Sequence, residues 1–365
     1  MSLNISGLND EENILFQFGK MYEKFGYVKL KMSKFEKYDF YINNKYFLNS
    51  SGMITFTDIN GDLLALKPHT TLSIAKRWRV GPNKVSKIYY HDDVYRICRK
   101  TKLYEKITQY GVECIGDIDL YNLCEVVGLA ADSLKSISNE TVLNISHLGV
   151  IIALLSDFNI EEMQQFELFK FIEDKNVKGI QTICTIVEIP DDVVNQILSL
   201  VSAYGPVEIV MPKLKKKITN SDAVKCLDEL EQVVKVVQSQ VNTKIIIDMS
   251  MTMGYMNYYD GIMFKGFVRD ISDNVIIGGQ YNKLMKCFGR SINAIGFAIY
   301  LDFIGRRENK EKHDIDVFVL YSDNDDVNAV YDKVRSLTNR GSVVFAGKTI
   351  DKSLNEKQVI NFGEL

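Results

Sequence analysis

A short stretch at residues 107–116, ITQYGVECIG, carries an amide, a glycine and a carboxylate at alternate positions. If this stretch is a β-strand, its period of two places Gln109, Gly111 and Glu113 on one face. The glycine leaves an empty slot beneath the two polar side chains, and a buried carboxylate is costly unless it meets a positive partner. The face therefore suits a ligand with an ammonium group or an N–H donor. The alternative is an exposed face on which Glu113 contacts water.

Four other side chains are candidates for the same ligand. Thr71 follows the turn KPHTT and offers a hydroxyl, although its local sequence fits a helix N-cap equally well. Arg96 lies on an alternating segment, where its guanidinium suits a carboxylate or a phosphate but also fits an exposed strand arginine. Tyr258 and Tyr259 stand at the mouth of the predicted strand GIMFKGF, a position from which two rings can hold a small molecule.

The usual catalytic and metal-binding signatures are missing from the sequence. It has no Walker loop, no GxGxxG after a predicted strand, no GxSxG elbow and no HExxH pair. The six cysteines include no CxxC pair and no histidine at zinc-ligand spacing, and the four histidines are scattered. We therefore expect no metal site and no cofactor.

The composition is that of a globular protein. The 365 residues are 46% hydrophobic and 25% charged, which allows two or three domains. The formal net charge of −3 gives no overall attraction to nucleic acid, so we expect none as a partner. The N-terminus lacks a signal-peptide pattern, and the most apolar run, GVIIALL, is too short to span a bilayer. These features, with the unpaired cysteines, predict a reduced, cytoplasmic chain without a membrane span.

The candidate residues lie on a pattern of alternating and helical segments. An amphipathic helix is predicted over residues 9–25 with a stop at Gly26, another over 70–79, and mostly helices from 118 to about 235, interrupted by a strand at TVLNISHLG. Strands are predicted around an Asn60-Gly61 hairpin, at 85–97 and 107–115 as an antiparallel pair, within 244–277, and at NAIGFAIYL. A strand-helix-strand unit follows residue 312.

Six segments, taken in chain order, resemble the catalytic core of histidyl-tRNA synthetase. They resemble still more closely its non-synthetase relative, the regulatory subunit of ATP phosphoribosyltransferase. The segments are LALKPHTTLSIAKRW, KIYYHDDVYRI, ITQYGVECIG, MNYYDGIMFKGF, GGQYNKLMKCFG and AIGFAIYLDFI.

The resemblance covers about residues 10–305. It implies an α+β fold in which a class II synthetase-like antiparallel sheet is flanked by helices. We expect this core over residues 1–310, with a helix-rich insertion at about 120–240 and a small C-terminal α/β domain over 312–365.

The resemblance also assigns roles to the candidate residues, because the family's amino-acid-binding groups are retained. It implies that Glu113 receives the α-ammonium of histidine, that Arg96, which matches the motif 2 arginine, receives the carboxylate, and that the tyrosines wall the imidazole. The residues that would bind histidine are Thr71, Arg96, Gln109, Glu113, Tyr258 and Tyr259.

The chain departs from the synthetase pattern where phosphate is handled. The arginine of the Arg-Gly-Leu-Asp-Tyr-Tyr motif is replaced by Gly254, and the motif 3 arginine by Phe303. Each such guanidinium supplies about 3–4 kcal/mol to the transition state of amino-acid activation, by analogy with an oxyanion donor. Other departures are Ser33 for the motif 1 proline, His69 for a glutamate, and Gln280 and Asn282 within GGQYN.

The resemblance therefore implies a catalytically inactive, histidine-sensing regulatory subunit. Its expected partners are a short-form ATP phosphoribosyltransferase catalytic subunit, histidine as effector, and a second copy of itself. The alternative is an active histidyl-tRNA synthetase or a related amino-acid-activating enzyme, which would catalyse histidine-dependent pyrophosphate exchange. A third hypothesis is a binding module with an altered ligand, because His69 and Asn257 change the floor of the pocket.

Overall fold

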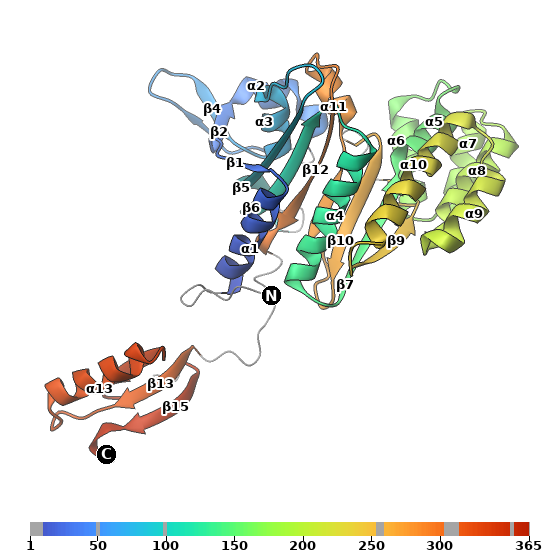
Figure 1. Cartoon of the computed structure of the whole chain (residues 1–365). Coiled ribbons are helices and arrows are strands. Elements are labelled where there is room, and N and C mark those ends of the chain that lie inside the picture. The colour runs from blue at the N-terminus through green and yellow to red at the C-terminus, as the bar shows by residue number, and fades with distance from the viewer. Residues whose placement is uncertain are drawn as a thin grey trace. The chain divides into compact units, whose positions relative to one another are not determined.

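The computed structural model describes residues 10–48, 52–97, 101–252, 259–302, 314–350 and 354–364. The chain forms two compact units, Met1–Arg306 and Arg307–Leu365. The first unit contains a large sheet with helices, and the second contains a three-stranded sheet with a helix (Figure 1). No helix within these ranges is long and apolar enough to cross a lipid bilayer.

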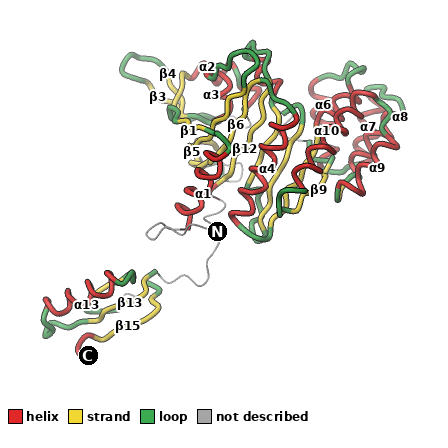
Figure 2. Tube along the Cα trace, in the orientation of Figure 1, coloured by secondary structure: helices red, strands yellow, loops and turns green. Residues whose placement is uncertain are grey.

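The first unit is built on a nine-stranded sheet with the strand order β1-β5-β6-β12-β11-β10-β7-β9-β8 (Figures 1 and 2). Its strand pairs are antiparallel except β1 with β5 and β7 with β9. The predicted fold class is therefore confirmed. The strands are β1 (Val28–Leu30), β5 (Val85–Ile97), β6 (Tyr104–Gly116), β7 (Thr141–His147), β8 (Tyr204–Gly205), β9 (Lys244–Asp248), β10 (Ile262–Val268), β11 (Ile276–Gln280) and β12 (Asn293–Tyr300).

Strands β5 and β6 form the longest pair, and their pairing sets the two faces of the sheet. Glu113 pairs with Ile88 on β5 and with Gly296 on β12. Tyr110 and Val112 point to the face covered by the long helices, where both are buried. The period of two thus places the candidate residues of β6 on the opposite face, as predicted.

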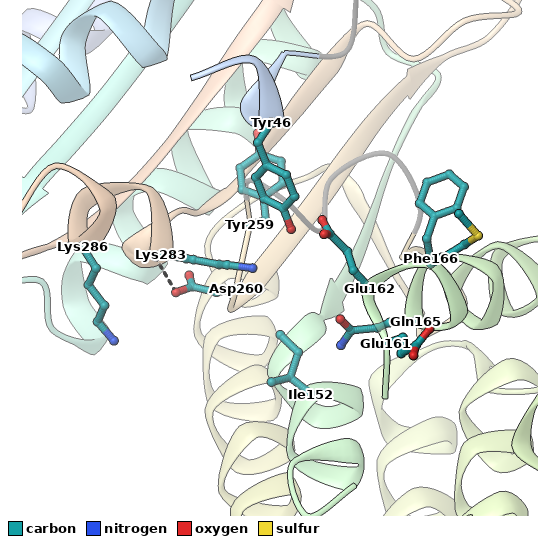
Figure 3. Close-up of a pocket in the computed structure, with 11 residues that line it drawn as sticks. Tyr46, Ile152, Glu161, Glu162, Gln165, Phe166, Tyr259, Asp260, Lys283 and Lys286 are labelled. Atoms are coloured by element: carbon teal, nitrogen blue, oxygen red, sulfur yellow. Dashed lines mark hydrogen bonds between the residues drawn. The ribbon is translucent and has the colours of Figure 1, made fainter. Parts of the chain in front are cut away.

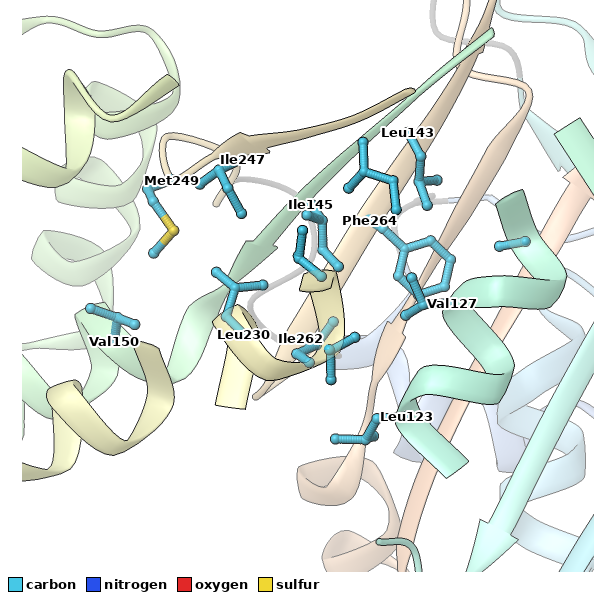
Figure 4. Packing of buried hydrophobic residues seen from close by; sticks show 14 of the residues in the cluster. Leu123, Val127, Leu143, Ile145, Val150, Leu230, Ile247, Met249, Ile262 and Phe264 are labelled. Atoms are coloured by element: carbon cyan, nitrogen blue, oxygen red, sulfur yellow. The ribbon is translucent and has the colours of Figure 1, made fainter. Parts of the chain in front are cut away.

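Three helices cover the first face: α1 (Asp10–Lys24), α4 (Leu120–Ile137) and α10 (Ser221–Gln238). Helix α4 begins at a capping box, in which Asp119 accepts a hydrogen bond from the Asn122 backbone N–H at 3.0 Å. Its apolar stripe includes Leu123 and Val127, which belong to one core cluster with Phe264 of β10, and Figure 4 shows Val127 beside the Phe264 ring. Burial of this stripe fixes α4 on the sheet.

The opposite face carries smaller elements around a second core, and this face contains the candidate site. They are the short helices α2 (Tyr38–Asn43), η1 (Lys45–Phe47), α3 (Thr70–Arg77) and α11 (Asn282–Cys287), with the sheet of β2 (Phe35–Lys37), β4 (Leu63–Leu66) and β3 (Thr55–Thr57). The predicted hairpin joins β3 to β4, and its Gly61 has a φ of 85°, which glycine adopts without strain.

The predicted helix-rich insertion at about 120–240 is wrong at both ends. Helices α4 and α10 pack on the sheet, and β7 is one of its central strands. Helical periodicity alone does not distinguish a helix that covers a sheet from one outside it. The remaining helices are α5 (Leu148–Leu155), α6 (Glu162–Glu173), α7 (Val177–Ile186), α8 (Asp191–Val201) and α9 (Val207–Lys217).

The second unit contains the predicted strand-helix-strand segment and one additional strand. A parallel sheet with the order β14-β13-β15 is formed by β13 (Ile315–Leu320), β14 (Val344–Gly347) and β15 (Glu356–Asn361), with α13 (Val327–Asn339) and the turn η2 (Phe362–Glu364). Strand β15, EKQVIN, was not predicted, because it is short and largely polar.

Candidate functional site

Glu113 is a buried carboxylate with hydroxyl partners. Its side chain is 1% exposed, its Oε1 accepts a hydrogen bond from Thr71 Oγ1 at 2.7 Å, and its Oε2 accepts one from Tyr281 OH at 2.7 Å. Burial raises the pKa of Glu113 to about 7, while the two hydroxyls act in the opposite direction. The alternative in which Glu113 contacts water on an open face is therefore wrong. A carboxylate held by neutral donors is suited to a cationic group of a ligand.

Glycines on the neighbouring strands make room for this carboxylate. A Cβ on Gly296 would lie 1.8 Å from Glu113 Oε2, so the side chain leans across β12. Gly279 of β11 pairs with Gly296, and a Cβ there would lie 3.0 Å from the Tyr259 ring. Because adjacent strands are about 4.8 Å apart, the carboxylate and this tyrosine lie over neighbouring glycines of one row.

The slot predicted above Gly111 is not empty. A Cβ on Gly111 would lie 2.2 Å from Cζ of Tyr90, so the ring of Tyr90 fills the space. The Tyr90 hydroxyl hydrogen-bonds Thr71, and burial, reinforced by the nearby Glu113 charge, raises the pKa of the phenol. Tyr90 therefore lies between Gly111 of β6 and Thr71 of α3.

Replacement of Gly111 by alanine should destabilise the protein by about 1–3 kcal/mol, because the added methyl group overlaps the Tyr90 ring. Urea unfolding measures the change. The matched control is Gly128→Ala in α4, where a Cβ meets nothing within 4 Å. That control should be neutral or stabilising by up to about 1 kcal/mol, since alanine favours a helix over glycine. Equal effects at both positions would contradict this account of Tyr90.

Thr71 is positioned by the start of α3, but it does not cap the helix. His69 is the N-cap, and its Nδ1 accepts a hydrogen bond from the Leu72 backbone N–H at 3.4 Å. The N-cap alternative for Thr71 is therefore wrong. Burial lowers the pKa of His69 to about 3, with a smaller contribution from the Arg96 charge, so the imidazole stays neutral near pH 7.

The other predicted site residues differ in how closely they approach Glu113. Gln109 is buried on the same face of β6. Arg96 Nε donates to the Pro68 carbonyl oxygen at 2.7 Å, which directs its half-buried side chain toward the start of α3. Tyr258 lies outside the described residues. The structure thus brings Thr71 and Glu113 into direct contact.

Tyr259 also lines a cavity of about 830 Å³ beside α6 and α11. Figure 3 shows Lys283 and Asp260 on one side of this cavity and Glu162 and Phe166 on the other.

The site residues that sequence reasoning missed are Tyr90 and Tyr281, the tyrosine of GGQYN. The position of Tyr281 between Gln280 and Asn282, inside a motif of the resemblance, is the signal that identifies it.

Most arginines described in the first unit are engaged away from Glu113. Arg77 pairs with Glu36, Arg269 pairs with Glu140, and Arg79 donates to the Lys76 carbonyl oxygen. Arg290 donates to the Lys76 and Trp78 carbonyl oxygens at the end of α3. The two positions where the synthetase arginines are replaced, 254 and 303, lie outside the described residues.

Comparisons with known proteins agree on one family. The family described as "Histidyl-tRNA synthetase" matches residues 6–304. A protein named ATP phosphoribosyltransferase regulatory subunit from Oceanobacillus iheyensis is 28% identical over 295 residues, 80% of this chain and 72% of that protein. One with the same name from Caldanaerobacter subterraneus is 28% identical over 348 residues, 92% of this chain and 89% of that protein.

Solved structures share the fold. An ATP phosphoribosyltransferase regulatory subunit/histidyl-tRNA synthetase from Bacillus halodurans has a TM-score of 0.74 at 23% identity, over 99% of this chain and 97% of that chain. A chain of the ATP phosphoribosyl transferase (HisG:HisZ) complex from Thermotoga maritima has a TM-score of 0.61 at 19% identity, over 80% of this chain and 98% of that chain.

Proposed function

Since the chain belongs to the histidyl-tRNA synthetase family, we propose that it is a cytoplasmic regulatory subunit of ATP phosphoribosyltransferase and not a synthetase. It binds histidine, activates a short-form catalytic subunit and conveys feedback inhibition. The observation that carries the proposal is the buried Glu113 carboxylate, whose described donors are the hydroxyls of Thr71 and Tyr281. The names of the curated relatives support the same function.

Near neutral pH, free histidine is a zwitterion, and its α-ammonium group needs an anionic partner when it is buried. Glu113 accepts hydrogen bonds from the α-ammonium group of histidine, and Thr71 holds the Glu113 carboxylate in place. Arg96 receives the α-carboxylate, because a guanidinium binds two oxygens at once. Gln109, on the same face of β6 as Glu113, contacts the same amino acid. The rings of Tyr258 and Tyr259 wall the imidazole.

We expect that the chain does not activate histidine with ATP, because two arginines of the family pattern are replaced by Gly254 and Phe303. Neither replacement stabilises phosphate charge. The loss of each guanidinium costs about 3–4 kcal/mol, so two together slow the reaction by roughly 10⁴-fold or more.

Regulation requires that histidine prefer one state of the assembly with the catalytic subunit. A coupling free energy of about 1–3 kcal/mol is sufficient for several-fold to about 150-fold inhibition. The chain acts as a dimer within this larger assembly. A ligand that bound both states equally would not inhibit.

The experiment that separates the regulatory subunit from the synthetase is histidine-dependent pyrophosphate exchange with the purified chain. We expect no exchange above background, together with saturable histidine binding by calorimetry. Exchange at a synthetase-like rate would overturn the proposal. A flat calorimetric trace with histidine, but heat with another amino acid, would favour the binding module with an altered ligand.

Histidine binding should weaken as the pH falls from 8 to 6. The pKa of Glu113 in the free protein is about 7, and its ionised fraction falls from about nine tenths to about one tenth over this range. Because binding needs the carboxylate, the affinity should fall roughly five- to tenfold. Calorimetry with triazolylalanine, whose ring stays neutral over this range, separates this carboxyl from the ligand's imidazole. A constant affinity for the analogue would contradict a role for Glu113 as the ammonium partner.

A further inference from the structure

Tyr281 occupies the N-cap position of α11, although its side chain does not cap the helix. Its hydroxyl instead donates to Glu113 Oε2 at 2.7 Å, and the residue is 1% exposed. N-cap positions favour short polar side chains, because these accept hydrogen bonds from the first free N–H groups of the helix. Other residues must therefore satisfy the start of α11 and fix the direction of the tyrosine.

Asp260 and Asn282 supply these contacts. Asp260 accepts a hydrogen bond from the backbone N–H of Asn282 at 3.0 Å and one from that of Lys283 at 2.8 Å, the second of which Figure 3 shows. Asn282 Oδ1 accepts a hydrogen bond from the Ala294 N–H of β12 at 3.0 Å, and the Ala294 carbonyl oxygen accepts one from the Tyr281 N–H at 2.9 Å. The backbone at the tyrosine is thus tied both to β12 and to the segment before β10.

Gln280 holds Asp260 in this position. Its carbonyl oxygen accepts a hydrogen bond from the Asp260 N–H at 3.1 Å, and its Oε1 accepts one from the Ile262 N–H at 2.6 Å. A Cβ on Gly261 would lie 2.1 Å from the same Oε1, so the glycine makes room for this amide. The departure from the synthetase pattern at position 280 therefore supports the carboxylate that caps α11.

The Tyr281 hydroxyl affects the charge of the carboxyl group that it contacts. Burial raises the pKa of Glu113, and the hydrogen bond from Tyr281 is the larger of the two that oppose this effect, the other coming from Thr71. The phenol of Tyr90 on β5 also faces this carboxyl group. If the Tyr281 ring moved away, more of Glu113 would be protonated near neutral pH and unable to pair with an ammonium group.

We propose that Asn282 and Asp260 are positioning residues for histidine binding, because they hold the Tyr281 hydroxyl against Glu113. The inference rests on the proposed function, since it assigns these residues to the same site. Both act through the backbone of α11 and its N-cap. Their loss changes the protonation of Glu113, an effect that a general loss of stability does not produce.

The test is a carbon-13 NMR titration of the Glu113 carboxyl group in the chain without ligand, where the signal is identified by its loss in Glu113→Gln. The midpoint of the unmodified chain should lie near pH 7, since burial raises the pKa of Glu113 to about 7. Tyr281→Phe should raise the midpoint by about one pH unit, because the charged form loses a donor. Asn282→Ala should raise it by about half a pH unit or more. The double variant should titrate like Tyr281→Phe, since the hydroxyl that Asn282 positions is then absent.

Asp260→Ala separates positioning from direct electrostatics, because the two effects have opposite signs. Loss of positioning raises the midpoint, whereas loss of a negative charge near Glu113 lowers it. The charges of Lys286 and His147, which act on Asp260, are retained in this variant. We expect the midpoint to rise, and this variant keeps the test decisive if Asn282→Ala does not fold.

The matched control is Asn220→Ala at the N-cap of α10, where the asparagine also accepts hydrogen bonds from backbone N–H groups. It should lose a similar amount of stability and leave the Glu113 midpoint unchanged. With histidine as the ligand, Asn282→Ala should bind about two- to fivefold more weakly at pH 7 and nearly normally at pH 8.5, where Glu113 is mostly ionised in both chains.

An unchanged midpoint in both Asn282→Ala and Asp260→Ala, or additive shifts in the double variant, would overturn the inference. The titration needs no ligand, so its failure leaves the proposed function in place. Absence of histidine binding by the unmodified chain would instead overturn the proposed function, while the titration still shows whether Asn282 acts on Glu113 through Tyr281.

Discussion

Replacement of Glu113 by glutamine should weaken histidine binding by about 100-fold or more. The carboxylate is buried, and its described donors are neutral hydroxyls, so the ammonium group of the ligand supplies its missing positive partner. Loss of one member of a buried, hydrogen-bonded charge pair costs about 2–5 kcal/mol. Calorimetric titration with histidine measures the change.

Glutamine preserves the size of the side chain and can still bond Thr71 and Tyr281, so the variant should stay folded. The matched control is Glu140→Gln, which removes an equal charge from an exposed ion pair with Arg269. The control should bind histidine like the unmodified chain. If both variants bound histidine with unchanged affinity, Glu113 would not be the partner of the ammonium group.

Replacement of Lys67 by methionine should destabilise the first unit by about 3–5 kcal/mol. The Lys67 side chain is fully buried; its Nζ pairs with Asp92 and donates to the Ser33 carbonyl oxygen at 3.0 Å. Burial lowers the pKa of the ammonium group. Removal of Lys67 leaves the Asp92 carboxylate buried with only the partly exposed Lys34, 3.5 Å away, as a cationic partner, and this is the costly way to break a buried pair. Urea unfolding measures the loss.

The double variant Lys67→Met with Asp92→Asn should recover much of the lost stability, because no buried carboxylate remains without its buried partner. The control Lys348→Met removes the exposed pair with Asp323 in the second unit and should leave the unfolding midpoint of the first unit unchanged. A double variant as unstable as the single one would show that packing of the lysine stem, and not the buried charge, is the cause.

Local patterns of the sequence predicted most of the elements, because their physical causes are local. Strands β5 and β6 follow from alternation, α1 from its apolar stripe and the stop at Gly26, and the hairpin from Asn60-Gly61. The extent of the insertion was wrong, since the sequence pattern of α4 does not reveal that it packs on the sheet. Strand β15 is recognisable mainly through its pairing with β13.

The candidate site was predicted only in part, because its geometry depends on contacts between distant segments. The common face of Gln109 and Glu113 follows from the period of a strand. Thr71 was a candidate because it ends the turn sequence KPHTT. That Tyr90 fills the space over Gly111 cannot be read from either position alone, since the two residues meet through strand pairing. The contact of Tyr281 with Glu113 joins residues 168 apart in the chain.

The most direct test of the regulatory role is a reconstituted assay of a short-form ATP phosphoribosyltransferase catalytic subunit. Its activity is measured alone, with this chain, and with this chain and increasing histidine. We predict that the chain raises the activity and that histidine inhibits the mixture, whereas a mixture made with the Glu113→Gln chain resists histidine. A catalytic subunit whose activity is the same with and without the chain, at every histidine concentration, would contradict the account.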